Sequence, residues 1–176
     1  MSQKTLESWF TTIETKPKKN KTIFYYDGVR NAKWITQIPK DSILIKKISW
    51  RSKHNLPPVV LCAKNNNTKN KLLENQDTSK IKEIAFLKSH LQKCVRRNNV
   101  KLAIITSIKL MQLDFNAFIR RLPIIMLEDS LLHDSFPLII WIMSCYPKFI
   151  PDNNIILELL KKVKYITLCP YKDIII

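Results

Sequence analysis

Ile81-Lys-Glu-Ile-Ala-Phe-Leu-Lys-Ser-His-Leu-Gln-Lys-Cys-Val95 is the stretch of sequence that decides the fold. Its apolar residues recur at helical spacing, at Ile81, Ile84, Leu87, Leu91 and Val95, whereas Lys82, Lys93 and Arg97 fall on other faces. The pair Asn98-Asn99 follows, and asparagine favours turns over helix interiors. The pattern predicts an amphipathic helix that ends at this pair and opens an α-helical domain over residues 80–176.

Three helices are predicted next along the chain. A second helix is expected at about 100–112, with inward-facing residues Ala103, Ile104, Ser107, Ile108 and Met111. Asp114 is a typical N-cap residue and predicts a third helix. Pro123, which is favoured in a first helical turn, predicts that a fourth helix opens there and carries residues 124–133.

The last part of the chain predicts two more helices. Ser135 with Pro137 begins one that is apolar nearly all round and is therefore expected to lie centrally. Asp152 is expected to cap a final helix that runs to about Lys164, and the tail over 165–176 is compatible with a short strand. This makes a bundle of five or six short helices.

The N-terminal half has the composition of β-strands. Three or four short strands are predicted from the runs of β-branched and aromatic residues at 22–26, 33–38, 42–50 and 58–63. We therefore expect a mainly α fold in four parts: a flexible tail (1–21), a small β-rich segment (22–64), a polar linker (65–79) and the helical domain (80–176).

Charge indicates the class of partner. The chain has 176 residues, a net charge of +16 and a pI of about 9.8. Such a basic protein favours a polyanion, and nucleic acid before a membrane. The longest apolar run, at 136–143, is far shorter than the roughly 20 residues of a membrane-spanning helix.

Several classes of site are disfavoured by what the sequence contains. Gly28 is the only glycine, so a phosphate-cradling nucleotide loop is not expected, and we predict no cofactor. The four cysteines lack metal-ligand spacing, and no signal peptide is recognised, so we expect free thiols in a reducing environment and no metal site. Abundant isoleucine, asparagine and lysine suggest an A+T-rich genome such as that of a large DNA virus or a parasite.

Residues 3–10, Gln-Lys-Thr-Leu-Glu-Ser-Trp-Phe, carry a spaced set of one glutamine, one aliphatic and two aromatic residues. A tight helical turn from Leu6 to Trp9 places both side chains on one side, and Phe10 extends the apolar surface. This layout resembles the PIP box, the peptide by which replication and repair proteins bind the sliding clamp PCNA. The resemblance implies that Gln3, Leu6, Trp9 and Phe10 contact a PCNA-type clamp. Otherwise these residues pack on their own domain.

A second resemblance covers residues 91–129. Leu91-Gln92-Lys93-Cys94-Val95-Arg96, Arg120-Arg121-Leu122 and Glu128-Asp129 are similar to the C-terminal helical domain of clamp-loader-like AAA+ ATPases of the Werner-helicase-interacting family. The resemblance implies a helical fold and a replication context. It does not imply ATPase activity, because no ATPase module precedes these residues here.

The candidate DNA-binding residues are basic side chains of both halves. They are Lys46, Lys47, Arg51, Lys88, Lys93, Arg96, Arg97, Arg120 and Arg121. Arginines near helix ends can contact phosphates. In the β-rich segment, Tyr25, Tyr26, Trp34 and Trp50 alternate with basic residues and are either a base-stacking surface or half-buried sheet residues.

An acidic group allows two interpretations. Glu128, Asp129 and His133 are close enough in sequence to form the metal site of a nuclease. The structural interpretation is that the two carboxylates pair with Arg120 and Arg121 across neighbouring helices and that His133 is capping or half-buried. We adopt the structural interpretation and expect no catalytic residue.

Together these patterns predict a non-catalytic accessory factor of DNA replication or repair that binds a sliding clamp and DNA. It would act in a nucleus or a viral replication compartment. The alternatives are a DNA repair nuclease and a helical adaptor for another replication or repair protein.

Overall fold

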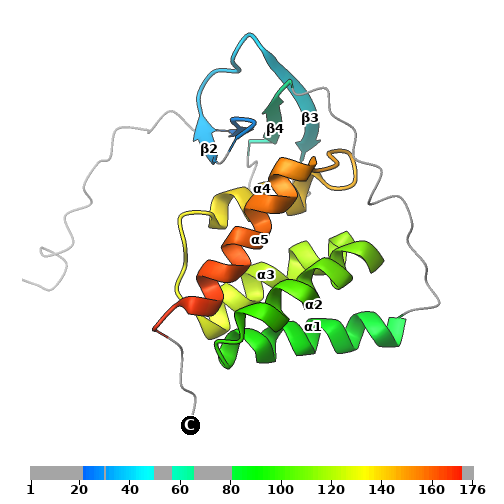
Figure 1. Ribbon diagram of the computed structural model, residues 1–176. Coiled ribbons are helices and arrows are strands. Elements are labelled where there is room, and N and C mark those ends of the chain that lie inside the picture. Colours follow the sequence, from blue (N-terminus) through cyan, green and yellow to red (C-terminus); the bar gives the residue numbers. More distant parts are fainter. Residues whose placement is uncertain (1–21, 30, 50–56, 66–80, 172–176) are drawn as a thin grey trace, which may run out of the picture.

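The computed structural model describes residues 22–29, 31–49, 57–65 and 81–171. These residues form the strands β1 (Ile23–Tyr26), β2 (Ala32–Ile35), β3 (Ser42–Ile48) and β4 (Val59–Lys64), followed by the helices α1 (Ile81–Arg96), α2 (Val100–Leu113), α3 (Phe115–Asp129), α4 (Phe136–Cys145) and α5 (Asn153–Leu168) (Figure 1). The expected tail and all but Asn65 of the expected linker lie outside the described residues.

The strands form one sheet in the order β2-β1-β4-β3. β1 pairs antiparallel with β2 and parallel with β4, and β3 pairs antiparallel with β4. Between β1 and β2 the Asp27 carboxylate accepts hydrogen bonds from the backbone N–H groups of Val29 and Asn31, at 2.8 and 3.1 Å. Gly28, at φ 81°, supplies the left-handed conformation that this turn requires.

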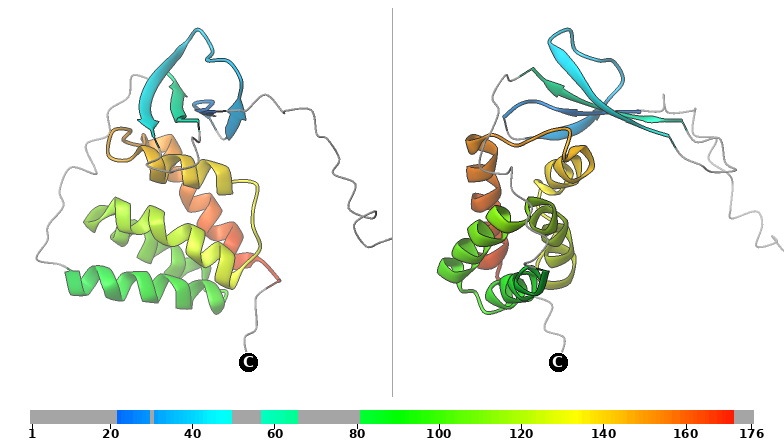
Figure 2. Two further views of the ribbon diagram at one scale, coloured as in Figure 1. Left: turned by 180° about the vertical axis from the view of Figure 1, so that it is seen from behind. Right: turned by 90° about the vertical axis from the view of Figure 1, so that its right-hand side faces the viewer.

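The sheet shares one hydrophobic core with the helices. Trp141 of α4 is fully buried, donates a 2.9 Å hydrogen bond from Nε1 to the Phe24 carbonyl, and has its ring 5.1 Å from that of Tyr26. Lys46 of β3 also reaches α4 and donates to the Ser144 carbonyl at 3.0 Å. Figures 1 and 2 show the sheet over α4, with α1 at the opposite end of the molecule.

The helix predicted from Ile81 onward is confirmed as α1. After it, Asn98 adopts a left-handed φ of 54° and Asn99 caps α2 by accepting from the Leu102 N–H at 3.1 Å. Ala103, Ser107 and Met111 are buried as expected. The assignment of Ile108 was wrong: it is 39% exposed, and Thr106 and Leu110 take up the buried face instead.

The predicted break at Pro123 was wrong. Asp114 caps α3 by accepting from the Ala117 N–H at 2.9 Å, as expected, but α3 then continues through Pro123 to Asp129. A proline inside a helix removes one backbone donor and normally costs stability. Here the helix is held by its packed face, because Ile119, Leu122, Ile125 and Met126 are fully buried.

The last two helices agree with the predicted starts. α4 begins after Ser135, and nine of its ten residues are buried or partly buried, so its central position is confirmed. The Asp152 carboxylate caps α5 by accepting from the Ile155 N–H at 2.9 Å. α5 runs four residues past the predicted end at Lys164, and the expected strand is therefore wrong for 165–168, where Ile166 and Thr167 are buried.

The resulting fold is mixed. Helices dominate, but the four-stranded sheet is built into the same core, so a mainly α bundle is too narrow a description. The buried residues that the sheet contributes to that core are Phe24, Tyr26, Ala32, Leu61 and Ala63.

Candidate functional site

Two sets of predicted binding residues lie outside the described residues. They are the four residues of the clamp-binding pattern, Gln3, Leu6, Trp9 and Phe10, and one basic residue of the sheet region, Arg51. The candidates that the structure describes are basic residues of the sheet and the helices.

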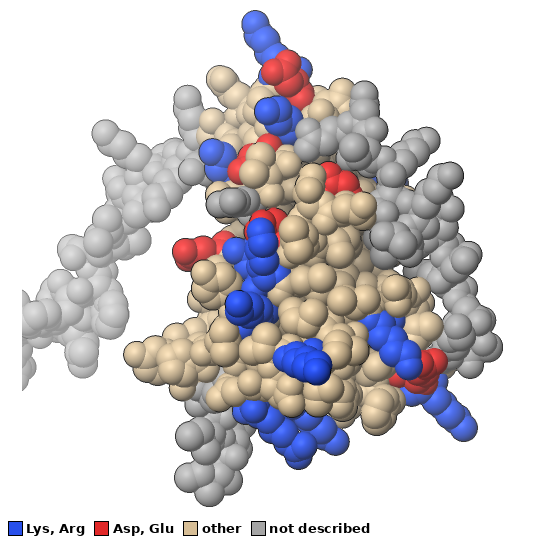
Figure 3. All heavy atoms as spheres, viewed as in Figure 1, with Lys and Arg blue, Asp and Glu red and all other residues tan. Residues whose placement is uncertain are grey.

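The described DNA-binding candidates do not share one face. Lys46 and Lys47 belong to β3, and the Lys46 ammonium is engaged by the Ser144 carbonyl. The remaining candidates belong to α1 and α3 or, for Arg97, follow the end of α1, and these two helices lie away from the sheet (Figures 1 and 2). On the face shown in Figure 3, Lys and Arg outnumber Asp and Glu over the helical part.

A polar seam runs between α1 and α3. Lys88, Gln92 and Arg96 recur every four residues and so share one side of α1. The facing side of α3 carries Arg121, Glu128 and Asp129. Residues four apart in a helix are one turn apart, and residues seven apart are two turns apart, so each row follows one side of its helix. The two rows can therefore interact along their length.

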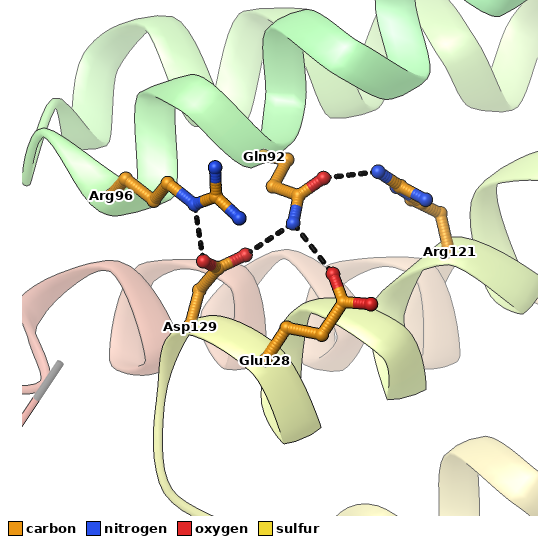
Figure 4. Close-up of polar contacts among 5 residues, drawn as sticks. All are labelled: Gln92, Arg96, Arg121, Glu128 and Asp129. Carbon is orange, nitrogen blue, oxygen red and sulfur yellow. Dashed lines mark hydrogen bonds and ion pairs between the residues drawn. The ribbon is translucent and has the colours of Figure 1, made fainter. Parts of the chain in front are cut away.

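Gln92 is the centre of this seam (Figure 4). It is 8% exposed, and its amide nitrogen donates to Glu128 Oε2 at 2.8 Å and to Asp129 Oδ2 at 2.6 Å. Its amide oxygen accepts a hydrogen bond from Arg121 Nη2, and Arg96 Nε pairs with Asp129 Oδ1. Because ionised carboxylates only accept and arginine only donates, these partners fix the orientation of the amide.

The expected partners of the carboxylates were wrong. Among the described residues, Arg120 and Arg121 form no ion pair with Glu128 or Asp129, and the arginine on Asp129 is Arg96. The prediction placed the arginines and the carboxylates on different helices. All four lie on α3, where seven to nine residues span about 10–14 Å, too far for direct pairing.

A pocket of about 170 Å³ opens between α1 and α3, beside the seam. It is lined by Lys88, Ala117, Arg120, Arg121 and Ile124. Lys88 and Arg120 make no hydrogen bond or ion pair with the residues that the structure describes. Arg121 Nε is buried and likewise lacks a hydrogen-bond partner in the described part of the chain. The pocket therefore presents positive charge and unused donors.

The other two basic candidates, Lys93 of α1 and Arg97 just after its end, are exposed. They are four residues apart and follow a different side of the helix from Lys88 and Arg96. They add positive charge next to the seam without lining the pocket.

The residues proposed for a nuclease site are held in separate contacts. Asp129 is 2% exposed and is bound by Arg96 and Gln92. His133 lies beyond the end of α3, where its Nδ1 accepts from the Ser135 N–H at 3.1 Å and its ring lies 5.4 Å from that of Tyr165. Of the two positions predicted for His133, capping or half-buried, the structure shows the half-buried one. No group of three or more His, Cys, Asp or Glu within the described ranges could hold a metal ion.

The sheet aromatics do not follow a single interpretation: Tyr25 is partly buried, Tyr26 is buried and Trp34 is exposed. Tyr26 is 1% exposed, and burial raises the pKa of its hydroxyl. Trp34 is 45% exposed and stacks on Phe24 at 4.8 Å between ring centroids. Trp50 lies outside the described residues.

The cysteines are free thiols, as predicted. Burial raises the pKa of Cys145 to about 12 and also raises the pKa values of Cys62 and Cys94. These three thiols are thus protonated at neutral pH and poor nucleophiles.

Three comparisons with known proteins were made: with family models, with curated protein sequences and with solved structures. None found a match. None of the helices in the described ranges is long and apolar enough to cross a membrane.

Sequence reasoning missed the role of Gln92 and the pocket. Gln92 was noted only within the resemblance to the ATPase family. The role of Gln92 could have been predicted from the row Lys88, Gln92 and Arg96, which places three polar residues at helical spacing beside an apolar stripe.

Proposed function

We propose that the protein is a non-catalytic accessory factor of DNA replication or repair that binds a PCNA-type sliding clamp through residues 3–10 and DNA through its basic helical surface. It acts where such clamps act, in a nucleus or a viral replication compartment. The observation that carries the proposal is the spacing of Gln3, Leu6, Trp9 and Phe10.

The clamp contact rests on the chemistry of these side chains. Two adjacent aromatic residues and one aliphatic residue can enter an apolar pocket together, and such anchors dominate interface energies. The basic segment that follows, with Lys16, Lys18 and Lys19, suits an acidic clamp surface or passing DNA.

The DNA contact rests on charge. A net charge of +16 favours a polyanion, and the α1–α3 pocket contributes three cationic side chains, two of which have no partner in the described part of the chain. An affinity for DNA that falls steeply with salt would support this contact, since phosphate neutralisation releases counterions. The absence of DNA binding at about 50 mM salt would favour the helical adaptor instead.

Calorimetry with a PCNA-type trimer tests the clamp contact. The full-length chain and a peptide of residues 1–21 should both bind at micromolar affinity or better, a free energy of at least about 8 kcal/mol. Changing Trp9 and Phe10 together to Ala should weaken binding by about 2–4 kcal/mol or more.

A matched control changes Thr11 and Thr12 together to Ala, just outside the pattern, and should leave the affinity unchanged. Equal affinity of the Trp9/Phe10 variant and the wild type would rule out the clamp contact.

A further inference from the structure

The pocket between α1 and α3 has the composition of an anion-binding site. Three of its five lining residues are the cations Lys88, Arg120 and Arg121, and the other two, Ala117 and Ile124, are apolar. No carboxylate of the described residues lines it. At about 170 Å³ it is several times larger than the roughly 30 Å³ that one water occupies in the liquid.

Arg121 is held in place before any ligand binds. Its Nη2 donates to Gln92 Oε1, and Gln92 is in turn fixed by Glu128 and Asp129 (Figure 4). A side chain that is ordered in advance loses less entropy when it binds a ligand. The planar donor array of a guanidinium also matches the oxygens of a phosphate.

The cationic residues that line the pocket have donors that the described part of the chain leaves unused. Arg121 Nε is buried without a hydrogen-bond partner there. A buried donor of this kind calls for an explanation such as a bound ion or ligand. The ammonium of Lys88 and the guanidinium of Arg120 face no acidic partner among the described residues.

Glu128 is the carboxylate whose negative charge would most repel an anion in the pocket. Its Oε2 accepts from the Gln92 amide, and the residue does not line the pocket. Asp129 is neutralised by Arg96. Three cations against one carboxylate leave a positive local charge.

We infer that this pocket is a phosphate-binding site that holds one backbone phosphate of a nucleic acid, with Arg121 and Arg120 donating to its oxygens and Lys88 supplying a third positive charge. The inference deepens the proposed DNA contact and rests on it for the source of the phosphate. Lys93, exposed on α1, and Arg97, exposed just after its end, are further cations that can meet neighbouring phosphates of the same strand. A single small anion would leave these cations unused, which favours the polymer.

The test compares two double variants of the full-length chain that remove the same charge. Lys88→Gln with Arg120→Gln removes two positive charges from the pocket. Neither substitution breaks a hydrogen bond or ion pair with the described part of the chain. Lys101→Gln with Lys164→Gln changes exposed lysines of α2 and α5 that do not line it. Thermal melting should show that both variants are folded.

The probes are a single-stranded oligonucleotide, followed by fluorescence anisotropy, and inorganic phosphate, followed by the backbone amide NMR shifts of Lys88, Ala117 and Arg121. We expect the pocket variant to bind the oligonucleotide at least about tenfold more weakly than the wild type. The affinity of the control variant should differ from that of the wild type by less than about twofold. We also expect phosphate to shift the three amides in the wild type and not in the pocket variant.

The outcomes separate this inference from the proposed function. If the wild type binds the oligonucleotide and the pocket variant loses no more affinity than the control, the pocket inference fails while DNA binding stands. If phosphate shifts the pocket amides but the oligonucleotide does not bind, the phosphate site stands and the DNA contact fails. Binding to vesicles that contain phosphatidylinositol phosphates, without oligonucleotide binding, would overturn the assignment to nucleic acid.

Discussion

At the scale of single residues, Gln92 joins two helices by meeting opposite chemical requirements with one amide. Its nitrogen serves the acceptors Glu128 and Asp129, and its oxygen serves the donor Arg121. A carboxylate or an ammonium at this position could serve only one side. The buried Asp129 is tolerated because Arg96 and Gln92 both bind it.

Removing the Asp129 carboxylate should therefore destabilise the protein. We expect Asp129→Ala to lower the free energy of unfolding by about 1–3 kcal/mol, because Arg96 and Gln92 lose a buried acceptor. Chemical denaturation measures the change. Asp134→Ala, at an exposed position a few residues on, is the control and should stay within about 0.5 kcal/mol of the wild type. Equal effects of the two substitutions would contradict the claim that the contacts of Asp129 with Arg96 and Gln92 stabilise the fold.

Cys145 predicts a pH dependence of stability. Burial raises its pKa in the folded protein to about 12, above the value of an unfolded thiol, so its stabilising contribution is complete below about pH 8.5 and is lost as the pH rises towards 12. Above pH 9 the wild type should therefore lose stability relative to Cys145→Ala. The loss in unfolding free energy should be up to about 1.4 kcal/mol per pH unit. A difference that is constant from pH 8 to 11 would contradict the buried neutral thiol.

At the scale of helices and strands, local signals predicted where elements begin better than where they end. Asp114 and Asp152 each cap a helix with the side-chain bond that their residue type predicts, and Asn99, which was expected only to end the first helix, also caps α2. The end of α3 and the continuation of α5 were misjudged. In both cases burial of apolar side chains, such as Ile125 in α3 and Ile166 in α5, overrides the local preference of a proline or of a polar run.

The cap of α3 gives a prediction at this scale. Asp114→Ala should lower the free energy of unfolding by about 1 kcal/mol, because the Ala117 N–H loses its 2.9 Å acceptor. Gln112→Ala, at an exposed position near the end of α2, should have little effect. Denaturant titration measures both variants. An unchanged midpoint for Asp114→Ala would show that the cap contributes nothing.

The candidate site illustrates the limit of pattern reading. The positive charges of α1 and α3 could be predicted from sequence, and so could the structural use of Asp129. Which arginine pairs with Asp129 could not, because that depends on how α1 crosses α3. The error at Pro123 had the same origin, since dividing α3 into two helices made Arg121 a candidate partner for a carboxylate that lies on its own helix.

At the scale of the whole molecule, the sheet is a structural layer on α4, and the α1–α3 pocket lies on helices away from it (Figures 1 and 2). In our proposal the N-terminal peptide binds the clamp while this helical surface binds DNA. Two linked contacts of this kind raise the apparent affinity well above that of either alone, provided that both can be made at once.

Binding of the full-length chain to DNA that carries a loaded PCNA-type clamp, compared with the same DNA without the clamp, tests this account most directly. The account predicts that the loaded clamp raises the apparent affinity of the wild type by at least about a hundredfold. The variant with Trp9 and Phe10 changed to Ala should show no such gain. A wild type that binds equally well with and without the clamp, or a variant that keeps the full gain, would contradict the proposed tether.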